Sequence, residues 1–338
     1  MINNKKIKFS KETTRMIFVT LGVFLVMGLL RPHLFFRSAN FLSMGYQLPE
    51  LGLYSLAMML AMLSGGIDLS VVAIGNLSGI VAAKVLQFGV ANNFVGGKLA
   101  FNIFLAVICA LIIGVVCGTF NGILISKLSI NPMLLTMASS LIIMGTSVLI
   151  SKAKSVSGIP DCLLYVGSHT LLGIPYSLWL FILVLIFVTF LLNKHSFGFK
   201  LKMVGGNPVA SKYSGINVSR IIIITYLLSG ILSSLCGLEI LFKTNAAKSD
   251  YASTYVLQAI LCAVLGATDP EGGFAKVSCL VLSLFSLQFL SSGFNLLRLS
   301  GYYKDFSWGL LLLLVLSIDY FSVLIKNIWR KFRRVKLC

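Results

Sequence analysis

Charged residues are scarce in this chain, and acidic residues most of all. Only 11% of its 338 residues are charged, with 10 Asp and Glu against 28 Lys and Arg, whereas an average soluble domain carries about 25% charged residues. Hydrophobic residues make up 57% of the chain and the mean hydropathy is +0.95. Too little polar surface is available to cover a soluble fold, and the apolar content excludes a disordered chain. The composition therefore predicts an all-α polytopic membrane protein.

The sequence also lacks the short motifs of catalytic and nucleotide-binding proteins. It contains no G-x-x-x-x-G-K-[ST] phosphate loop, no HExxH or GxSxG motif and no C-x-x-C pair among its seven cysteines. A P-loop needs its glycine-rich turn and lysine to hold phosphates, and a zinc site needs clustered thiolate or imidazole ligands. We therefore expect a transport subunit that is not an enzyme, with no nucleotide site of its own, no metal and no cofactor.

Long apolar runs divide the chain into membrane-spanning segments. About 20 mostly apolar residues are needed to cross a bilayer, and this rule predicts about ten transmembrane helices, of which 48–64 and 252–267 are short. The predicted spans are 16–31, 48–64, 68–91, 100–126, 132–151, 176–193, 220–242, 252–267, 276–294 and 306–325. They form one transmembrane domain, 16–325, between an N-terminal tail, 1–15, and a basic C-terminal tail, 326–338.

The distribution of Lys and Arg predicts the orientation. With ten spans, 18 basic residues fall on the side that carries both termini, and 10 fall on the other side. Cytoplasmic loops are enriched in Lys and Arg, so both termini are predicted to be cytoplasmic. The same distribution accounts for the net charge of +18 without invoking nucleic acid, because no aromatic stacking platform accompanies it.

The 194–220 loop between two spans is basic and contains no acid. Asn207 is a good N-cap, Pro208 suits the first helical position and Gly215 can end a helix. This pattern predicts a short helix over 208–214. The loop is either an ordinary basic connector or a rigid peg for a cytoplasmic partner.

Five motifs in sequence resemble one family. They are SGGIDLS at 64–70, GTFNG at 118–122 followed by Asn131-Pro132, VGGN at 204–207 with SGIN at 214–217, VLGA at 264–267 with Gly272-Gly273, and SSGFN at 291–295. Their order and spacing, from about 48 to 320, resemble permease subunits of bacterial ABC sugar importers of the ribose and autoinducer-2 type, within the branched-chain-type permease superfamily. Asp269-Pro270-Glu271 departs from that pattern by placing charge before Gly272.

The resemblance implies a multi-pass protein of the bacterial plasma (inner) membrane that translocates a monosaccharide or a similar small polyol or furanose. It implies separate cytoplasmic ATP-binding subunits, a second permease that is identical or similar, and an extracytoplasmic sugar-binding protein. It assigns Gly65, Gly66 and Asp68 to a structural signature. Residues implied to couple the permease to the ATPase are Gly205, Gly206, Asn207, Pro208, Ala210, Ser211, Tyr213, Ser214 and Gly215.

Uncharged polar side chains within the spans are candidates to line a sugar pathway, because a sugar needs hydrogen-bond donors, acceptors and an aromatic face. Equally, such residues hold neighbouring spans together. The candidates are Tyr54, Asn76, Asn121, Gln258, Gln288 and Asn295. Ribose, another pentose or hexose, and an autoinducer-like furanose all fit this set.

Three acidic residues invite separate interpretation. Asp68, at the start of a span, is expected to accept backbone N–H bonds. Glu239 is either a functional intramembrane acid or a carboxylate that reaches the outer interface near Lys243, and Asp319 is expected to anchor a span end. An ion-gradient-driven secondary transporter is the alternative function, although it would normally place acids nearer the membrane midplane.

An intramembrane enzyme is a further rival function. It would need a pair of titratable groups within reach of each other, and the spans offer no obvious pair.

Overall fold

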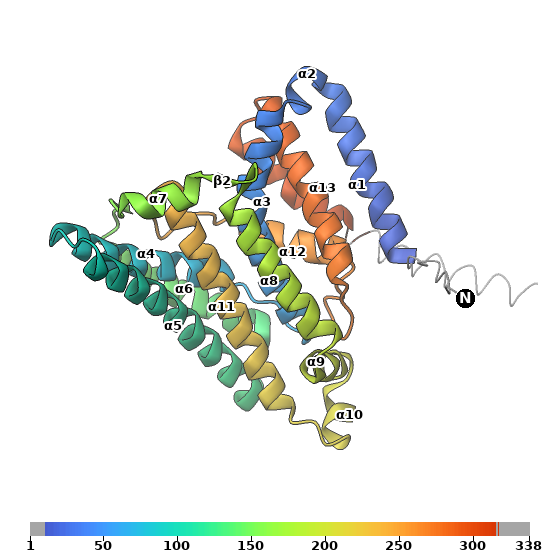
Figure 1. Ribbon diagram of the computed structural model, residues 1–338. Helices are drawn as coiled ribbons and strands as arrows, with labels where there is room; N and C mark the ends of the chain where they lie inside the picture. Colours follow the sequence, from blue (N-terminus) through green and yellow to red (C-terminus); the bar gives the residue numbers. More distant parts are fainter. Residues whose placement is uncertain (1–10, 316, 318–338) are drawn as a thin grey trace, which may run out of the picture.

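The computed structural model describes residues 11–315 and 317, and it is a bundle of α-helices with two short pairs of antiparallel strands (Figure 1). A further helical segment covers 301–315. The elements are α1 (Lys11–Leu30), α2 (Pro32–Phe35), α3 (Ser38–Leu63), α4 (Val71–Ala91), α5 (Gly97–Leu128), α6 (Pro132–Ser151), β1 (Val156–Ser157), α7 (Asp161–Ser168), β2 (Thr170–Leu171), β3 (Ile174–Pro175), α8 (Tyr176–Asn193), α9 (Ser196–Gly206), α10 (Pro208–Tyr213), α11 (Val218–Thr244), β4 (Ala246–Ala247), α12 (Tyr255–Leu265) and α13 (Val277–Leu296). Strand β1 pairs antiparallel with β4, and β2 with β3.

Helix α11 is packed against α5, α4 and α3. Glycines allow this close approach: a Cβ on Gly230 would lie 2.1 Å from the carbonyl oxygen of Gly114, and one on Gly237 would lie 2.0 Å from that of Gly75. Small residues let helix backbones approach closely in a membrane, where apolar side chains gain little by leaving lipid. We call these two contacts the glycine seam.

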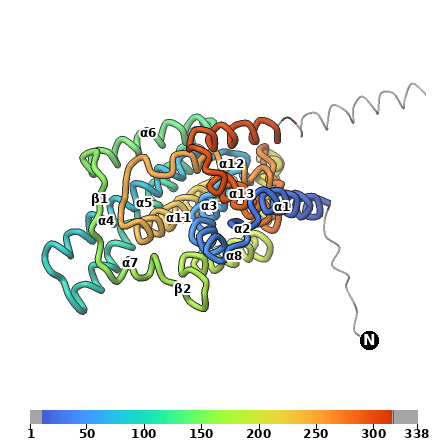
Figure 2. The backbone as a smooth tube through the Cα atoms, turned by 90° about the horizontal axis from the view of Figure 1, so that it is seen from above, coloured from blue at the N-terminus to red at the C-terminus, as the bar shows by residue number. Residues whose placement is uncertain are grey.

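Helix α3 runs near the middle of the bundle, between α11 and α13 (Figure 2). Every residue from Leu48 to Leu63 is buried, and this apolar run packs with α8, α12 and α13 into the largest core cluster. Helix α1 lies at the edge and packs against α13. The α3 run is therefore an interior wall, whereas α5, α6 and α8 keep much of their apolar surface exposed, as lipid-facing helices do.

Seven helices within the described residues are long and apolar enough to cross a membrane. They coincide with predicted spans and confirm an all-α polytopic membrane protein. Helix α3 is not among the seven, although it has 26 residues. The tenth predicted span, 306–325, lies only partly within the described residues, as do the two tails. The total of ten and the cytoplasmic placement of both termini stay predictions.

The predicted span 252–267 differs from the structure. Its helix, α12, has 11 residues, which corresponds to about 16 Å at 1.5 Å per residue, whereas the hydrocarbon layer is about 30 Å thick. Backbone turns flank α12 on both sides, because residues 249–254 and 266–276 are non-helical. Such a short helix cannot cross the layer on its own, and it is held inside the protein by α3 and α13.

Candidate functional site

The loop 194–220 contains two helices, α9 and α10, at one end of the bundle, opposite to α2 and α7 (Figure 1). The short helix predicted at 208–214 is confirmed as α10. The Oδ1 atom of Asn207 accepts the N–H of Ala210 at 2.9 Å, Pro208 occupies the first turn, and Gly215 follows the helix with φ +79°. Helix α9 was not predicted, because on sequence 194–207 belongs to the basic loop between two spans.

Three glycine pairs that are far apart in sequence meet beside α9. Gly205 lies against the backbone of Leu63 and Gly273, and a Cβ on Gly272 would lie 2.8 Å from the Cα of Gly65. The N–H of Gly273 donates to the carbonyl of Leu63 at 3.1 Å. Gly65, Gly272 and Gly273 have φ of +87°, +98° and +82°, which side chains strongly disfavour. We call this the glycine junction; it joins α9 directly to the end of α3 and to the turn 269–273.

The predicted coupling residues fall into two groups, buried and exposed. Gly205 and Ser211 are buried, so they support the loop from inside. Tyr213, with 89% of its side chain exposed, is the most prominent member of the exposed group. The exposed members are Gly206, Asn207, Pro208, Ala210, Tyr213, Ser214 and Gly215.

Asp68 lies in the turn before α4, where it is fully buried. Its Oδ1 accepts the N–H of Ser70 at 3.0 Å and the Ser70 hydroxyl at 2.6 Å, and its Oδ2 accepts the Ser229 hydroxyl at 2.7 Å. Asn121 donates to the same Ser70 hydroxyl at 2.9 Å. The polar cluster thus ties the α3–α4 turn to α5 and α11, and it places Asn121 in this cluster rather than among the other pathway candidates. Gly66 is buried beside it, in contact distance of Tyr226 and Pro132.

Two pathway candidates, Gln258 and Gln288, line one cavity of about 120 Å³ between α3, α12, α13 and the 301–315 segment. Gln47, Tyr255 and Trp308 line it too. Amide groups, an indole and a phenol in one cavity provide the donors, acceptors and aromatic face that a sugar needs, and Lys304 and Asp305 also line it. We call it the glutamine cavity.

The remaining candidates lie elsewhere. The ring of Tyr54 packs edge-on to Tyr255 at 6.3 Å, and its buried hydroxyl has no hydrogen-bond partner among the described residues. Asn76 donates to the carbonyls of Ser249 and Tyr251 at 3.0 and 2.9 Å, so it holds the turn before α12. Asn295 is exposed and accepts a hydrogen bond from Lys304.

Glu50, on α3, is a buried acid that was not singled out from the sequence. It forms an ion pair with Lys243 and accepts the Tyr255 hydroxyl at 3.1 Å. Lys243 also donates to the carbonyl of Tyr46 at 3.0 Å. The sequence did contain a signal for Glu50, namely an acidic residue within an apolar run. Such an acid is costly in a membrane unless it is paired, so a partner could have been expected.

Glu239 is buried as well, with 7% exposed, so the second of its two interpretations, a carboxylate that reaches the outer interface, does not hold. Lys243 pairs with Glu50 instead, and neither carboxylate oxygen of Glu239 has a hydrogen-bond partner among the described residues. Its side chain lines an apolar cavity of about 260 Å³ between α7, α8 and α11. Asp319 lies outside the described residues.

Comparison with known families identifies the fold. Residues 40–316 match the family described as "Branched-chain amino acid transport system / permease component". The chain belongs to this family. The permease is accordingly a multi-pass membrane protein and a transport component, and the matched region includes the glycine junction, the Asp68 cluster and the glutamine cavity.

The permease is similar over most of its length to proteins named as import permeases. It is 31% identical to the ribose import permease protein RbsC of Bacillus subtilis (strain 168), covering 88% of this chain and 91% of that protein. It is 29% identical to RbsC of Escherichia coli (strain K12), covering 84% and 87%. It is 26% identical to the autoinducer 2 import system permease protein LsrD of Enterobacter sp. (strain 638), covering 97% and 99%. These relatives agree with an import permease rather than with an ion-driven secondary transporter.

Proposed function

We propose that the permease is the membrane-spanning subunit of an ATP-binding cassette importer in the bacterial plasma membrane, and that it carries a monosaccharide or a similar small furanose. In this proposal, separate ATP-binding subunits dock on α10 and a second permease completes the pathway. An extracytoplasmic binding protein delivers the sugar. The observation that carries the proposal is the capped, exposed helix α10 attached to the glycine junction.

The glycine junction connects the proposed ATPase docking helix, α10, to the helices around the glutamine cavity. Helix α10 follows α9 directly, and α9 contacts the end of α3 and the turn 269–273 through backbone atoms at Gly205. Both of these connect to helices that line the glutamine cavity, α3 and α13. A displacement of α10 by an ATPase would therefore reach the cavity through main-chain contacts, and ATP would shift the population between inward- and outward-open states by binding one of them more tightly.

Tyr213→Ala is expected to reduce the amount of ATPase that co-purifies with the permease. A large exposed aromatic side chain is the type of residue that dominates protein interfaces, and its loss should lower recovery of the ATPase about tenfold or more. The measurement is a mild-detergent pull-down of the tagged permease from its native membrane, with mass spectrometry of the bound proteins.

Tyr302→Ala is the matched control, because Tyr302 is 88% exposed and lies beside the glutamine cavity, away from α10. ATPase recovered equally with the wild type, Tyr213→Ala and Tyr302→Ala would contradict docking on α10. Absence of any ATPase in several detergents would contradict the importer itself.

Gln258→Leu and Gln288→Leu are each expected to lower sugar uptake about fivefold, the value of roughly one lost hydrogen bond. Both side chains are nearly buried in the glutamine cavity. Uptake of radiolabelled ribose, arabinose and allose into cells that carry the complete importer is the measurement, and it also selects among the sugars.

Gln87→Leu, on α4 and outside the cavity lining, serves as the control. If both cavity variants retain full uptake of every transported sugar, these glutamines only hold helices together and the pathway lies elsewhere.

A further inference from the structure

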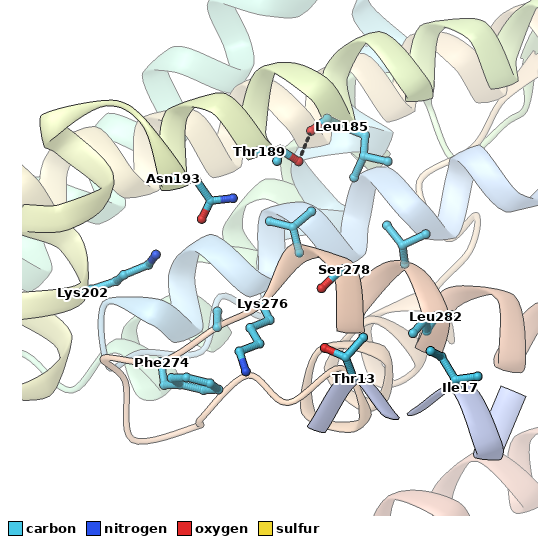
Figure 3. Close-up of a pocket in the computed structure, with 13 residues that line it drawn as sticks. Thr13, Ile17, Leu185, Thr189, Asn193, Lys202, Phe274, Lys276, Ser278 and Leu282 are labelled. Atoms are coloured by element: carbon cyan, nitrogen blue, oxygen red, sulfur yellow. Dashed lines mark hydrogen bonds between the residues drawn. The ribbon is translucent and has the colours of Figure 1, made fainter. Parts of the chain in front are cut away.

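A groove of about 770 Å³ lies between α1, α8, α9 and α13, at the α9 end of the bundle (Figure 3). Lys202 and Asn193 lie at one end of the view, and Ile17 and Leu282 lie at the other. The groove thus has a polar end and an apolar end, as an amphipathic ligand has.

The ammonium group of Lys202 lies at the polar end, as does Asn193 (Figure 3). Lys202 donates to the carbonyl of Leu192 at 3.2 Å, which uses one of the three donors of its ammonium. Lys276 lies 2.8 Å from the carboxylate of Glu12 and over the ring of Phe274, 5.1 Å from its centroid. Because Glu12 offsets Lys276, Lys202 leaves the polar end with a net positive charge.

The N-terminus of α13 opens into the same end. Val277 and Ser278, its first two residues, line the groove, and the first turn of α13 has neither an acidic residue nor a side-chain cap. Main-chain N–H groups at the start of a 20-residue helix favour an anion, particularly a phosphate. The exposed hydroxyl of Ser278 adds a donor beside them.

The apolar end determines what kind of anion fits. Ile17, Leu185, Val281 and Leu282 come from three long apolar helices and line the groove without a charge among them. A soluble phosphate would gain nothing from these side chains, whereas an acyl chain would bury its methylenes against them.

We propose that this groove binds an anionic phospholipid, with its phosphate held by Lys202 and the N-terminus of α13 and one acyl chain lying along Ile17, Val281 and Leu282. Basic pockets between transmembrane helices suit anionic headgroups, and each lysine near the surface contributes about a fivefold preference. None of the residues that line this groove lines the glutamine cavity or belongs to α10.

The test measures binding of phosphatidylglycerol and phosphatidylcholine to the full-length permease in detergent by native mass spectrometry. The wild type is expected to bind phosphatidylglycerol about fivefold or more tightly than phosphatidylcholine. Lys202→Gln should remove most of this preference, whereas Lys200→Gln should leave it unchanged, because Lys200 is exposed on α9 and outside the groove lining.

Ser278→Asp is a second test variant. It introduces a negative charge at the phosphate position and leaves Lys202 and its bond to the Leu192 carbonyl in place. An acid in the first turn of a helix interacts favourably with the helix dipole, so α13 should remain folded, while the new carboxylate repels the lipid phosphate. Ser278→Asn is its uncharged control. A thermal unfolding midpoint at or above that of the wild type, together with lost phosphatidylglycerol preference, is the expected result.

Three results would overturn the proposal. The first is equal binding of the two lipids to the wild type. The second is a preference that survives both Lys202→Gln and Ser278→Asp. The third is displacement of phosphatidylglycerol by inorganic phosphate at millimolar concentration, which would assign the polar end to a soluble anion.

Discussion

Gly205→Ala is expected to lower sugar uptake strongly and to lower the thermal stability of the permease, whereas Gly206→Ala is expected to be tolerated. A Cβ on Gly205 would lie 1.9 Å from the carbonyl oxygen of Leu63 and 2.5 Å from the backbone nitrogen of Gly273. A Cβ on Gly206 would have a single neighbour, the Cα of Gly273, at 3.9 Å.

The difference arises because the obstacles at Gly205 are main-chain atoms, which cannot move aside as a flexible side chain can. Inserting a methyl group into a packed interior costs about 1–3 kcal/mol, and more where the backbone must shift. Here the shift would separate α9 from the end of α3 and break the hydrogen bond from Gly273 to Leu63. If this packing cost exceeds about 1.4 kcal/mol, the fraction of permease with an intact junction relative to the disrupted form changes about tenfold or more. We therefore expect uptake to fall by at least about the same factor.

Uptake in cells and the thermal unfolding midpoint in detergent are the two readouts, with protein levels in the membrane measured alongside. Adjacent glycines that receive the same methyl group form a matched pair. Equal behaviour of the two variants, whether both active or both inactive, would show that the glycine junction does not govern transport.

Lys243→Met is expected to destabilise the permease by about 3 kcal/mol, because it leaves a buried carboxylate without its cation. Glu50 is 1% exposed and would retain only the Tyr255 hydroxyl among its described partners. The thermal unfolding midpoint in detergent measures the loss. Lys248→Met is the control, because Lys248 carries the same charge five residues later and is exposed.

Adding Glu50→Leu to Lys243→Met is expected to recover most of the stability. Replacing both members of a buried ion pair by apolar residues is often neutral, while removal of one member is costly. A double variant as unstable as Lys243→Met alone would show that the lysine stabilises the protein through its bond to the Tyr46 carbonyl rather than through Glu50.

The elements that the sequence predicts well are those governed by local chemistry. Apolar length predicted the long helices, and Asn207, Pro208 and Gly215 predicted α10 because caps and turn residues act within a few positions. Helix α9 escaped prediction because its residues belong, on sequence, to the basic loop 194–220, while in the structure Gly205 is required by the backbone of α3 and of the turn 269–273, a contact that no local pattern reveals.

The candidate site was predicted in part for the same reason. Polar residues in the spans were identifiable, but which of them meet depends on helix packing: Gln258 and Gln288 share a cavity, whereas Asn121 lies with Asp68 and Asn76 holds two carbonyls. Glu50 was identifiable as an intramembrane acid, yet its partner, Lys243, is 193 residues away in sequence. Long-range pairing is decided by the assembled bundle.

The glycine seam limits how this protein can change shape. Where α11 meets α4 and α5, the helix backbones are in direct contact, so no change of side-chain rotamer can loosen the contact. We therefore expect α4, α5 and α11 to move as one rigid body during a transport cycle. Hinge motion would then be confined to the other side of α3, where non-helical turns flank the short helix α12 and precede α13.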